Sequence, residues 1–177
     1  MKLWQRILVV WGGFSLIAIM VFTGYMIYSM TVGDTVEIDQ ATVSDVRFVL
    51  NWCGLGEQRI ERVMHSYSTP TSLTGDHLTE YSIKINHVTK EELENANVIR
   101  GKWYRGDKLP QVLDEAVSFI ARSQGETTWF PKEKNIKTQD YYIYSCIIGY
   151  VGLNPNSAQL IFINLKDKMV YYADEKI

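Results

Sequence analysis

One long apolar run dominates the first 30 residues. No residue from Ile7 to Met30 is charged, and the 24 residues of this run would form a helix about 36 Å long. The hydrocarbon core of a bilayer is roughly 30 Å thick, so such a helix spans it with some tilt. Lys2 and Arg6 precede the run, and Asp34 is the first charged residue after it. Because basic flanks stay on the cytoplasmic side, the sequence predicts a single-pass anchor with a cytoplasmic N-terminus.

A cleaved signal peptide is the competing interpretation of this run. Its apolar region would have about 7–15 residues and end at a small-x-small cleavage site, which Thr31-Val32-Gly33 matches poorly. We therefore expect an uncleaved signal anchor that contacts the bilayer through residues 7–30. Homo-oligomerisation is not indicated, because Leu16 and Ile17 replace the second small residue of a small-xxx-small motif. This gives three parts: a cytoplasmic tip and anchor over 1–30, a short linker over 31–40, and an extracytoplasmic domain over 41–177.

The first half of the domain combines helical and alternating patterns. Apolar positions in 46–53 recur with helical spacing, with Ser44 as the expected N-cap and Gly54 as the end. A similar spacing of Ile60, Val63, Met64 and Tyr67 predicts a second helix that stops before Pro70. Residues 80–86 alternate, which predicts a strand with Tyr81, Ile83 and Ile85 on its buried face and a wet opposite face.

Two further helices are predicted before the C-terminal third. Thr89 and Glu92 have the spacing of a capping box, which opens a short helix reaching about Ala96. A longer amphipathic helix is expected from about Pro110 to Arg122, since proline suits the first helical turn.

The last third is rich in β-branched and aromatic residues. Three such runs, at 140–151, 158–165 and 169–173, are separated by segments typical of turns. Consecutive strands with short connections form an antiparallel meander, and the middle run is apolar on both faces, as a central strand is. The sequence therefore predicts an α+β domain in which a mostly antiparallel sheet packs against amphipathic helices.

Composition and charge exclude some classes of protein. Hydrophobic residues make up 46% of the chain, which is enough for a packed core and excludes a disordered protein. The formal net charge is −2, and no basic stripe is present to neutralise phosphates. Nucleic acid is therefore not an expected partner.

Two cysteines, Cys53 and Cys146, both lie beyond the predicted anchor. An extracytoplasmic compartment permits a disulfide, and both side chains are expected to point toward the core. Two free, buried thiols are the alternative, because unpaired cysteine is itself a common core residue.

The candidates for catalysis are few. His77 lies where a loop enters a strand, and Asp76 or Glu80 could orient it as a general base. No phosphate-binding loop, nucleophile elbow or set of metal ligands with zinc spacing is present, so no cofactor and no metal are expected.

Aromatic residues beside turns are the more prominent feature. One group contains Trp103, Tyr104 and Arg105 in a predicted loop, and a second contains Trp129 and Phe130. These residue types are enriched in binding hot spots, because they offer a large contact area with a polar group. Alternatively, the rings close the ends of the core and matter for stability alone.

Together these features favour a membrane-anchored domain that binds another protein, with a bacterial periplasm as the expected compartment. An accessory subunit of an envelope assembly and an immunity-type protein are both consistent with this expectation. The alternatives are a membrane-tethered hydrolase or metal-dependent enzyme using His77 with Asp76 or Glu80, and a small-ligand sensor domain. No arrangement typical of an enzyme stands out in the sequence.

Overall fold

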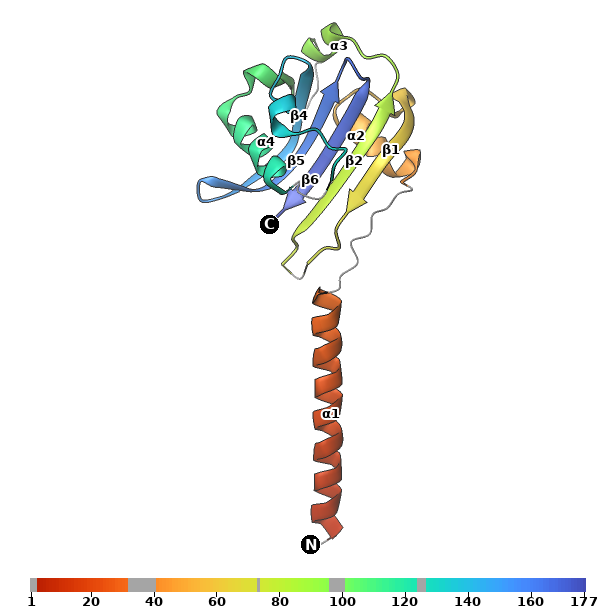
Figure 1. Ribbon diagram of the computed structural model, residues 1–177, viewed down its shortest axis with the longest axis vertical. Helices are drawn as coiled ribbons and strands as arrows, with labels where there is room; N and C mark the ends of the chain where they lie inside the picture. Colours follow the sequence, from red (N-terminus) through yellow and green to blue (C-terminus); the bar gives the residue numbers. More distant parts are fainter. Residues whose placement is uncertain (1–2, 32–40, 73, 96–100, 124–126) are drawn as a thin grey trace. The chain divides into compact units, whose positions relative to one another are not determined.

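The computed structural model describes residues 3–31, 41–72, 74–95, 101–123 and 127–177 (Figure 1). The chain divides into two compact units, Met1–Asp34 and Thr35–Ile177. The predicted linker, 31–40, lies outside the described residues except for its first residue.

The first unit contains one uninterrupted helix, α1 (Leu3–Thr31). Its large apolar side chains from Trp4 to Tyr25 that are described are 59–75% exposed, and Met26 is partly buried. Among the residues that the structure describes, no helix combines the length and apolar character needed to cross a bilayer. The membrane anchor expected over residues 7–30 stays a prediction, because some side chains in this range lie outside the described ones.

The second unit is a mixed α+β domain built on a six-stranded antiparallel sheet (Figure 1). The strands are β1 (Ile60–Ser68), β2 (His77–Ile85), β3 (Trp103–Arg105), β4 (Tyr141–Val151), β5 (Asn154–Asn164) and β6 (Met169–Lys176). Their order across the sheet is β1-β2-β6-β5-β4-β3. The predicted C-terminal meander is confirmed, because β4 pairs with β5 and β5 with β6, both antiparallel.

Strand β5 is central and is covered on both faces. Ile161 and Ile163 face α2 (Val43–Trp52), while Leu160 and Phe162 face α4 (Gln111–Ser123), and all four are 0% exposed. Two apolar clusters therefore form, one on each face of the sheet, and they share β5. We call these faces the α2 face and the α4 face.

Helix α2 begins at a different cap from the predicted one. Thr42 occupies the N-cap position, and both its backbone N–H and its hydroxyl donate to the Asp45 carboxylate, at 2.8 and 2.7 Å. The prediction of Ser44 as the cap was wrong, because the helix begins at Val43. The predicted buried stripe is confirmed, since Val46, Val49 and Leu50 are 0% exposed.

The helix predicted over 60–67 is absent, and this segment is the edge strand β1 instead. Two register irregularities interrupt its pairing with β2, between Ile60 and Arg62 and between Val63 and His65. Such irregularities break the two-residue alternation of a strand, so inward-facing positions fall three apart, as they do in a helix. The spacing of apolar residues was therefore misleading here.

Three smaller expectations also changed. The face of β2 predicted to be wet is partly covered, since Glu80 and Ser82 are 0% and 1% exposed. The β4–β5 connection is shorter than predicted, with Gly152 and Leu153 alone between the strands and Gly152 at a φ of +63°, where glycine is favoured. Residues 103–105 form the strand β3, which pairs with β4, instead of lying in a loop.

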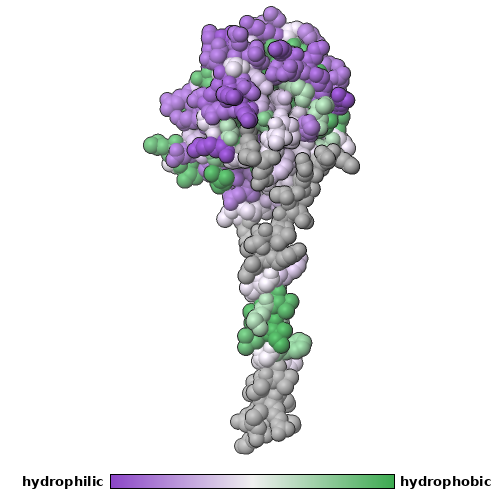
Figure 2. Space-filling model, in the orientation of Figure 1, coloured by the Kyte–Doolittle hydropathy of each residue, from purple (hydrophilic) through white to green (hydrophobic). Residues whose placement is uncertain are grey.

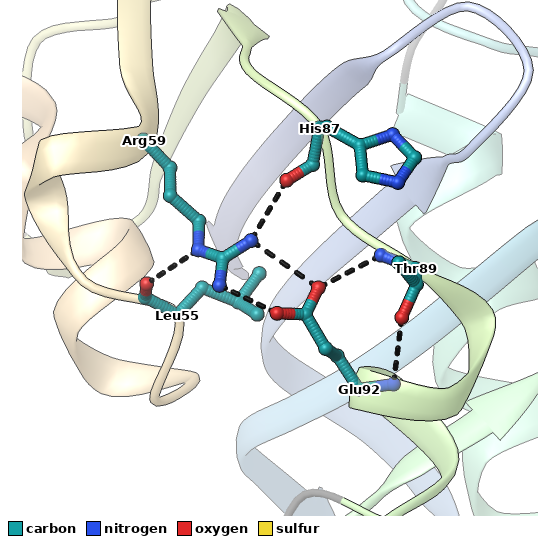
Figure 3. Close-up of polar contacts among 5 residues, drawn as sticks. All are labelled: Leu55, Arg59, His87, Thr89 and Glu92. Atoms are coloured by element: carbon teal, nitrogen blue, oxygen red, sulfur yellow. Dashed lines mark hydrogen bonds and ion pairs between the residues drawn. The ribbon is translucent and has the colours of Figure 1, made fainter.

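An ion pair connects the segment after α2 to α3 (Lys90–Glu94) (Figure 3). The Arg59 guanidinium donates to both carboxylate oxygens of Glu92, at 2.7 and 3.2 Å, and to the His87 carbonyl at 2.8 Å. Glu92 also accepts the Thr89 backbone N–H, which confirms the predicted capping box. The Arg59 hydrogen bond holds the pKa of Glu92 below its usual value. One carboxylate thus caps α3 and fixes it to the 3-10 turn (Glu57–Arg59) between α2 and β1.

Candidate functional site

A cavity on the α2 face is the first feature of a candidate site. It has a volume of about 210 Å³ and is lined by Trp52, Tyr144, Cys146, Ile147 and Gln159. Trp52 ends α2 and packs on Phe48, with ring centroids 4.6 Å apart, while the other four residues come from β4 and β5. The cavity therefore lies where α2 ends and the sheet continues.

A register irregularity in β4 shapes the floor of this cavity. The pairing with β5 shifts between Ser145 and Ile147, and the extra residue is Cys146. Bulges of this kind redirect side chains. As a result, the consecutive residues Cys146 and Ile147 both line the cavity.

A polar cluster continues from the Gln159 wall of the cavity. The Gln159 amide donates to Asp174 Oδ2 at 2.7 Å, and the Tyr172 hydroxyl donates to the same oxygen at 3.3 Å. His77 Nε2 lies 3.4 Å from Asp174 Oδ1, and His77 Nδ1 lies 3.0 Å from the Gly75 carbonyl. The carbonyl can only accept, so it favours a proton on Nδ1. These groups on neighbouring strands offer hydrogen bonds beside the cavity.

The thiols near this site are not activated. Cys146 and Cys53 are both free in the structure. Burial raises the pKa of each thiol to about 12, and the charge of Asp174 adds to the shift at Cys146. Because the thiolate is the reactive form, neither residue serves as a nucleophile near neutral pH.

The three residues of the predicted His77 site are not brought together. His77 points to the α2 face, whereas Glu80 is three residues further along β2 and points to the α4 face. The Asp76 carboxylate accepts from the Thr74 hydroxyl at 2.5 Å. Asp174, which is distant in sequence, is the carboxylate beside His77.

The aromatic groups predicted to form a binding surface also lie apart. Trp103 is 7% exposed and packs against Tyr144 on the α2 face, with ring centroids 5.3 Å apart. Phe130 is 4% exposed and belongs to the α4-face cluster, against which Trp129 and Tyr104 also pack. These residues therefore contribute to two cores on opposite faces of the sheet.

The Arg105 side chain forms an ion pair with a residue close by in the sequence. Its guanidinium donates to the two carboxylate oxygens of Asp107 at 2.5 and 3.0 Å. This contact holds the pKa of Asp107 below its usual value. The Arg105 guanidinium and the Asp107 carboxylate are thus already paired with each other.

Two carboxyl groups are buried on the α4 face. Glu80 accepts a hydrogen bond from the Thr127 hydroxyl at 2.7 Å, and Glu175 accepts one from the Ser123 hydroxyl. Glu175 is 2% exposed, and burial raises its pKa to about 7. No cluster of three or more potential metal ligands occurs in the part of the chain that the structure describes.

The end of the β4–β5 hairpin, located in Figure 1, presents apolar side chains to solvent (Figure 2). Val151 and Leu153 are 68% and 91% exposed, and Val112 on the neighbouring α4 is 53% exposed. Tyr150 connects the two elements, because its hydroxyl donates to the Val112 carbonyl at 3.3 Å. We call these four residues the hairpin patch. Contiguous exposed apolar residues of this kind mark interaction sites.

Comparison with known proteins does not assign a family. No protein-family model, curated protein sequence or solved structure is similar enough to this chain to indicate one. The geometry of the domain is therefore the basis for a functional assignment.

Sequence reasoning missed most of this site. Trp52, Gln159 and Asp174 were not predicted as site residues. The pairing of β5 with β6 places Gln159 opposite Asp174, and the packing of α2 on the sheet brings Trp52 to the cavity. One signal was available in the sequence: no residue from Tyr141 to Leu165 is charged, which is unusual for strands that end at solvent.

The burial of Trp103 predicts that Trp103→Ala destabilises the domain. Removing a buried tryptophan leaves a cavity and costs about 3–5 kcal/mol. The free energy of unfolding of the unit beginning at Thr35, measured in urea, should fall by this amount. Arg105→Ala, which removes an exposed ion pair, should cost less than about 1 kcal/mol. If Trp103→Ala and Arg105→Ala lowered the free energy of unfolding by equal, small amounts, the placement of Trp103 in the core would be contradicted.

The raised pKa of Glu175 predicts a specific pH dependence. The folded state favours the protonated form of the Glu175 carboxyl. The contribution of this carboxyl to the free energy of unfolding is therefore complete below about pH 4.5 and is lost as the pH rises through about 7. Glu175→Gln should therefore gain stability relative to the wild type between pH 5 and 8, by roughly 3 kcal/mol or less. Urea midpoints across this range measure the difference. Glu61→Gln, an exposed control on β1, should follow the wild-type curve, and a parallel curve for Glu175→Gln would show that Glu175 is not buried.

Proposed function

We propose that this chain is a single-pass, membrane-anchored protein whose extracytoplasmic domain binds another protein. The binding surface comprises the hairpin patch and the cavity beside Trp52, both of which include residues of β4. The exposed apolar end of the β4–β5 hairpin is the observation that carries this proposal.

The anchor is supported by the character of α1. A helix that is apolar on all sides must be covered by lipid or by protein. The large apolar side chains of α1 from Trp11 to Tyr25 are exposed, and the uncharged run from Ile7 to Met30 reaches beyond them in both directions. Lys2 and Arg6 favour a cytoplasmic N-terminus, which leaves the domain on the other side, in the periplasm of a bacterium.

Protein binding is supported by the surface of the domain. Leu153, the most exposed of its large apolar side chains, forms the tip of a hairpin and contributes nothing to the core. Ile147, at the cavity, is 61% exposed. Exposed apolar side chains that stabilise neither core lower the solubility of a protein unless a partner covers them.

The two alternative functions receive less support from the geometry. The enzyme alternative needs His77 beside Asp76 or Glu80, but Glu80 points to the opposite face of the sheet. The pKa of the thiol beside the cavity is raised to about 12, so it is not an activated nucleophile. A small-ligand sensor would need a pocket of about 300–1,000 Å³ lined mostly by apolar groups. The cavity beside Trp52, at about 210 Å³, is below this range, and two larger hollows of about 390 and 470 Å³ are lined mainly by charged and polar residues.

The proposed topology predicts the behaviour of a reporter fused after Ile177. Alkaline phosphatase, which needs an oxidising compartment, should be active in this position, because the basic residues Lys2 and Arg6 retain the N-terminus inside. Replacing both residues with glutamate removes this bias and should lower the activity. Full activity of a cytoplasmic reporter at the same position would contradict the topology.

The proposed binding surface predicts site-dependent cross-linking in native membranes. A photoreactive benzoylphenylalanine at Leu153 in the full chain should form a discrete cross-linked product with another protein. The same residue at Met64 of β1, which is 37% exposed on the opposite edge of the sheet, is the matched control. Identical products from both positions, or none from Leu153, would contradict the assignment of the hairpin patch.

A further inference from the structure

The hollow of about 470 Å³ adjoins the hairpin patch. Its lining comes from α4, from the start of α5 (Glu133–Ile136) and from the end of the β4–β5 hairpin. Leu153, which is 91% exposed, belongs both to this lining and to the hairpin patch. A partner that covers Leu153 therefore also meets the charged side chains of this hollow, which we call the α4 hollow.

Carboxylates outnumber cations around the α4 hollow. Asp114, Glu115 and Glu133 line it, while Arg122 is the one cation among the described residues of the lining. Lys137 lies next to the hollow and donates to Asp114 at 2.7 Å and to Glu133 at 2.9 Å. One ammonium is thus shared by two carboxylates. The three carboxylates and two cations leave an excess of negative charge beside the hairpin patch.

Glu115 is the carboxylate that has only neutral partners in the described parts of the chain. It forms none of the ion pairs found there and accepts a hydrogen bond from the Gln111 amide at 2.9 Å. It also contacts the Tyr150 hydroxyl of the hairpin patch. Partial burial, followed by the charge of Glu115, raises the pKa of Tyr150. An uncompensated negative charge therefore lies at the border between the hollow and the apolar patch.

The Glu115 end of the hollow is the end that faces the hairpin. Glu115 lies in the first half of α4, where Tyr150 contacts it. The chain leaves α4 at Ser123, whose hydroxyl donates to β6, and the described chain resumes at Thr127, whose hydroxyl donates to β2. Both strands lie further from β4 than β5 does. The contacts that flank residues 124–126 are therefore directed away from Glu115.

The charge of Glu115 limits what can cover this part of the surface. An apolar group placed over the carboxylate would remove its water and leave a buried, unpaired charge. An acidic group would add repulsion between like charges. A lysine or arginine instead replaces the lost water with a charge-assisted hydrogen bond. Charge complementarity therefore favours a basic side chain next to the apolar ones that cover Leu153.

We propose that the partner protein docks through an apolar segment that carries one lysine or arginine. The apolar side chains of this segment cover Leu153 and Val151, and its basic side chain enters the α4 hollow and pairs with Glu115. This inference rests on the proposed function and specifies the chemistry of the partner segment that the hairpin patch accepts.

A peptide selection on the full chain in detergent micelles tests this docking mode. The probe is a library of random dodecapeptides displayed on phage, from which binders to Leu153→Ser are first removed. Sequences then enriched on the wild type should share large apolar residues and one lysine or arginine. Glu115→Gln, which removes the charge and keeps the shape, should weaken binding of a synthetic enriched peptide about fivefold or more. Glu61→Gln, the same change at an exposed position of β1, should leave binding within about twofold.

A charge swap tests whether the basic residue pairs with Glu115 itself. Glu115→Arg should weaken binding of the enriched peptide about tenfold or more, and glutamate in place of the basic residue of the peptide should restore binding to this variant. Enriched peptides without a basic residue, equal effects of Glu115→Gln and Glu61→Gln, or no restoration by the swap would overturn the proposal.

Two further outcomes of this experiment would also overturn it. One is the absence of any peptide whose binding depends on Leu153. The other is a dimer of the free chain that Leu153→Ser dissociates, which would assign the hairpin patch to a second copy. Cross-linking from Leu153 in native membranes does not depend on the charge of Glu115, so binding of a protein can stand where the basic segment fails.

Discussion

The burial of β5 on both faces is the constraint on which the domain depends. Ile161 and Phe162 are consecutive, point to opposite faces and are both fully buried, so each face needs a layer of helix. Helix α2 supplies one layer and α4 the other, and both cores include side chains of this strand. Strands β4 and β6 pair with β5 on either side, and β3 and β2 pair in turn with those two strands.

The need to cover β5 on both faces is only partly met on the α2 face, because α2 is much shorter than the strand. Helix α2 has ten residues and is about 15 Å long, whereas β5 has eleven residues and is about 37 Å long. One short helix cannot cover the whole face, and the part beyond Trp52 holds the cavity and the His77–Asp174–Gln159 cluster. The candidate site therefore lies where the sheet continues beyond the end of α2.

Local patterns allowed prediction of the local elements. The capping box at Thr89, the amphipathic stripe of α4 and the C-terminal meander depend on residues close in sequence, and all three were predicted. The strand β1 was mistaken for a helix, because its register irregularities are set by pairing with β2. Asp174 beside His77 could not be found for a related reason, since the register of β2 on β6 brings these two residues together across nearly a hundred intervening positions.

The central claim is that β5 is buried on both faces of the sheet. Unfolding of Ile161→Ala and Phe162→Ala in urea measures this most directly, because the two side chains point to opposite faces and are both 0% exposed. Each substitution should lower the free energy of unfolding by about 2–5 kcal/mol. A small effect of either substitution would mean that one face of β5 is not covered, and would contradict the account.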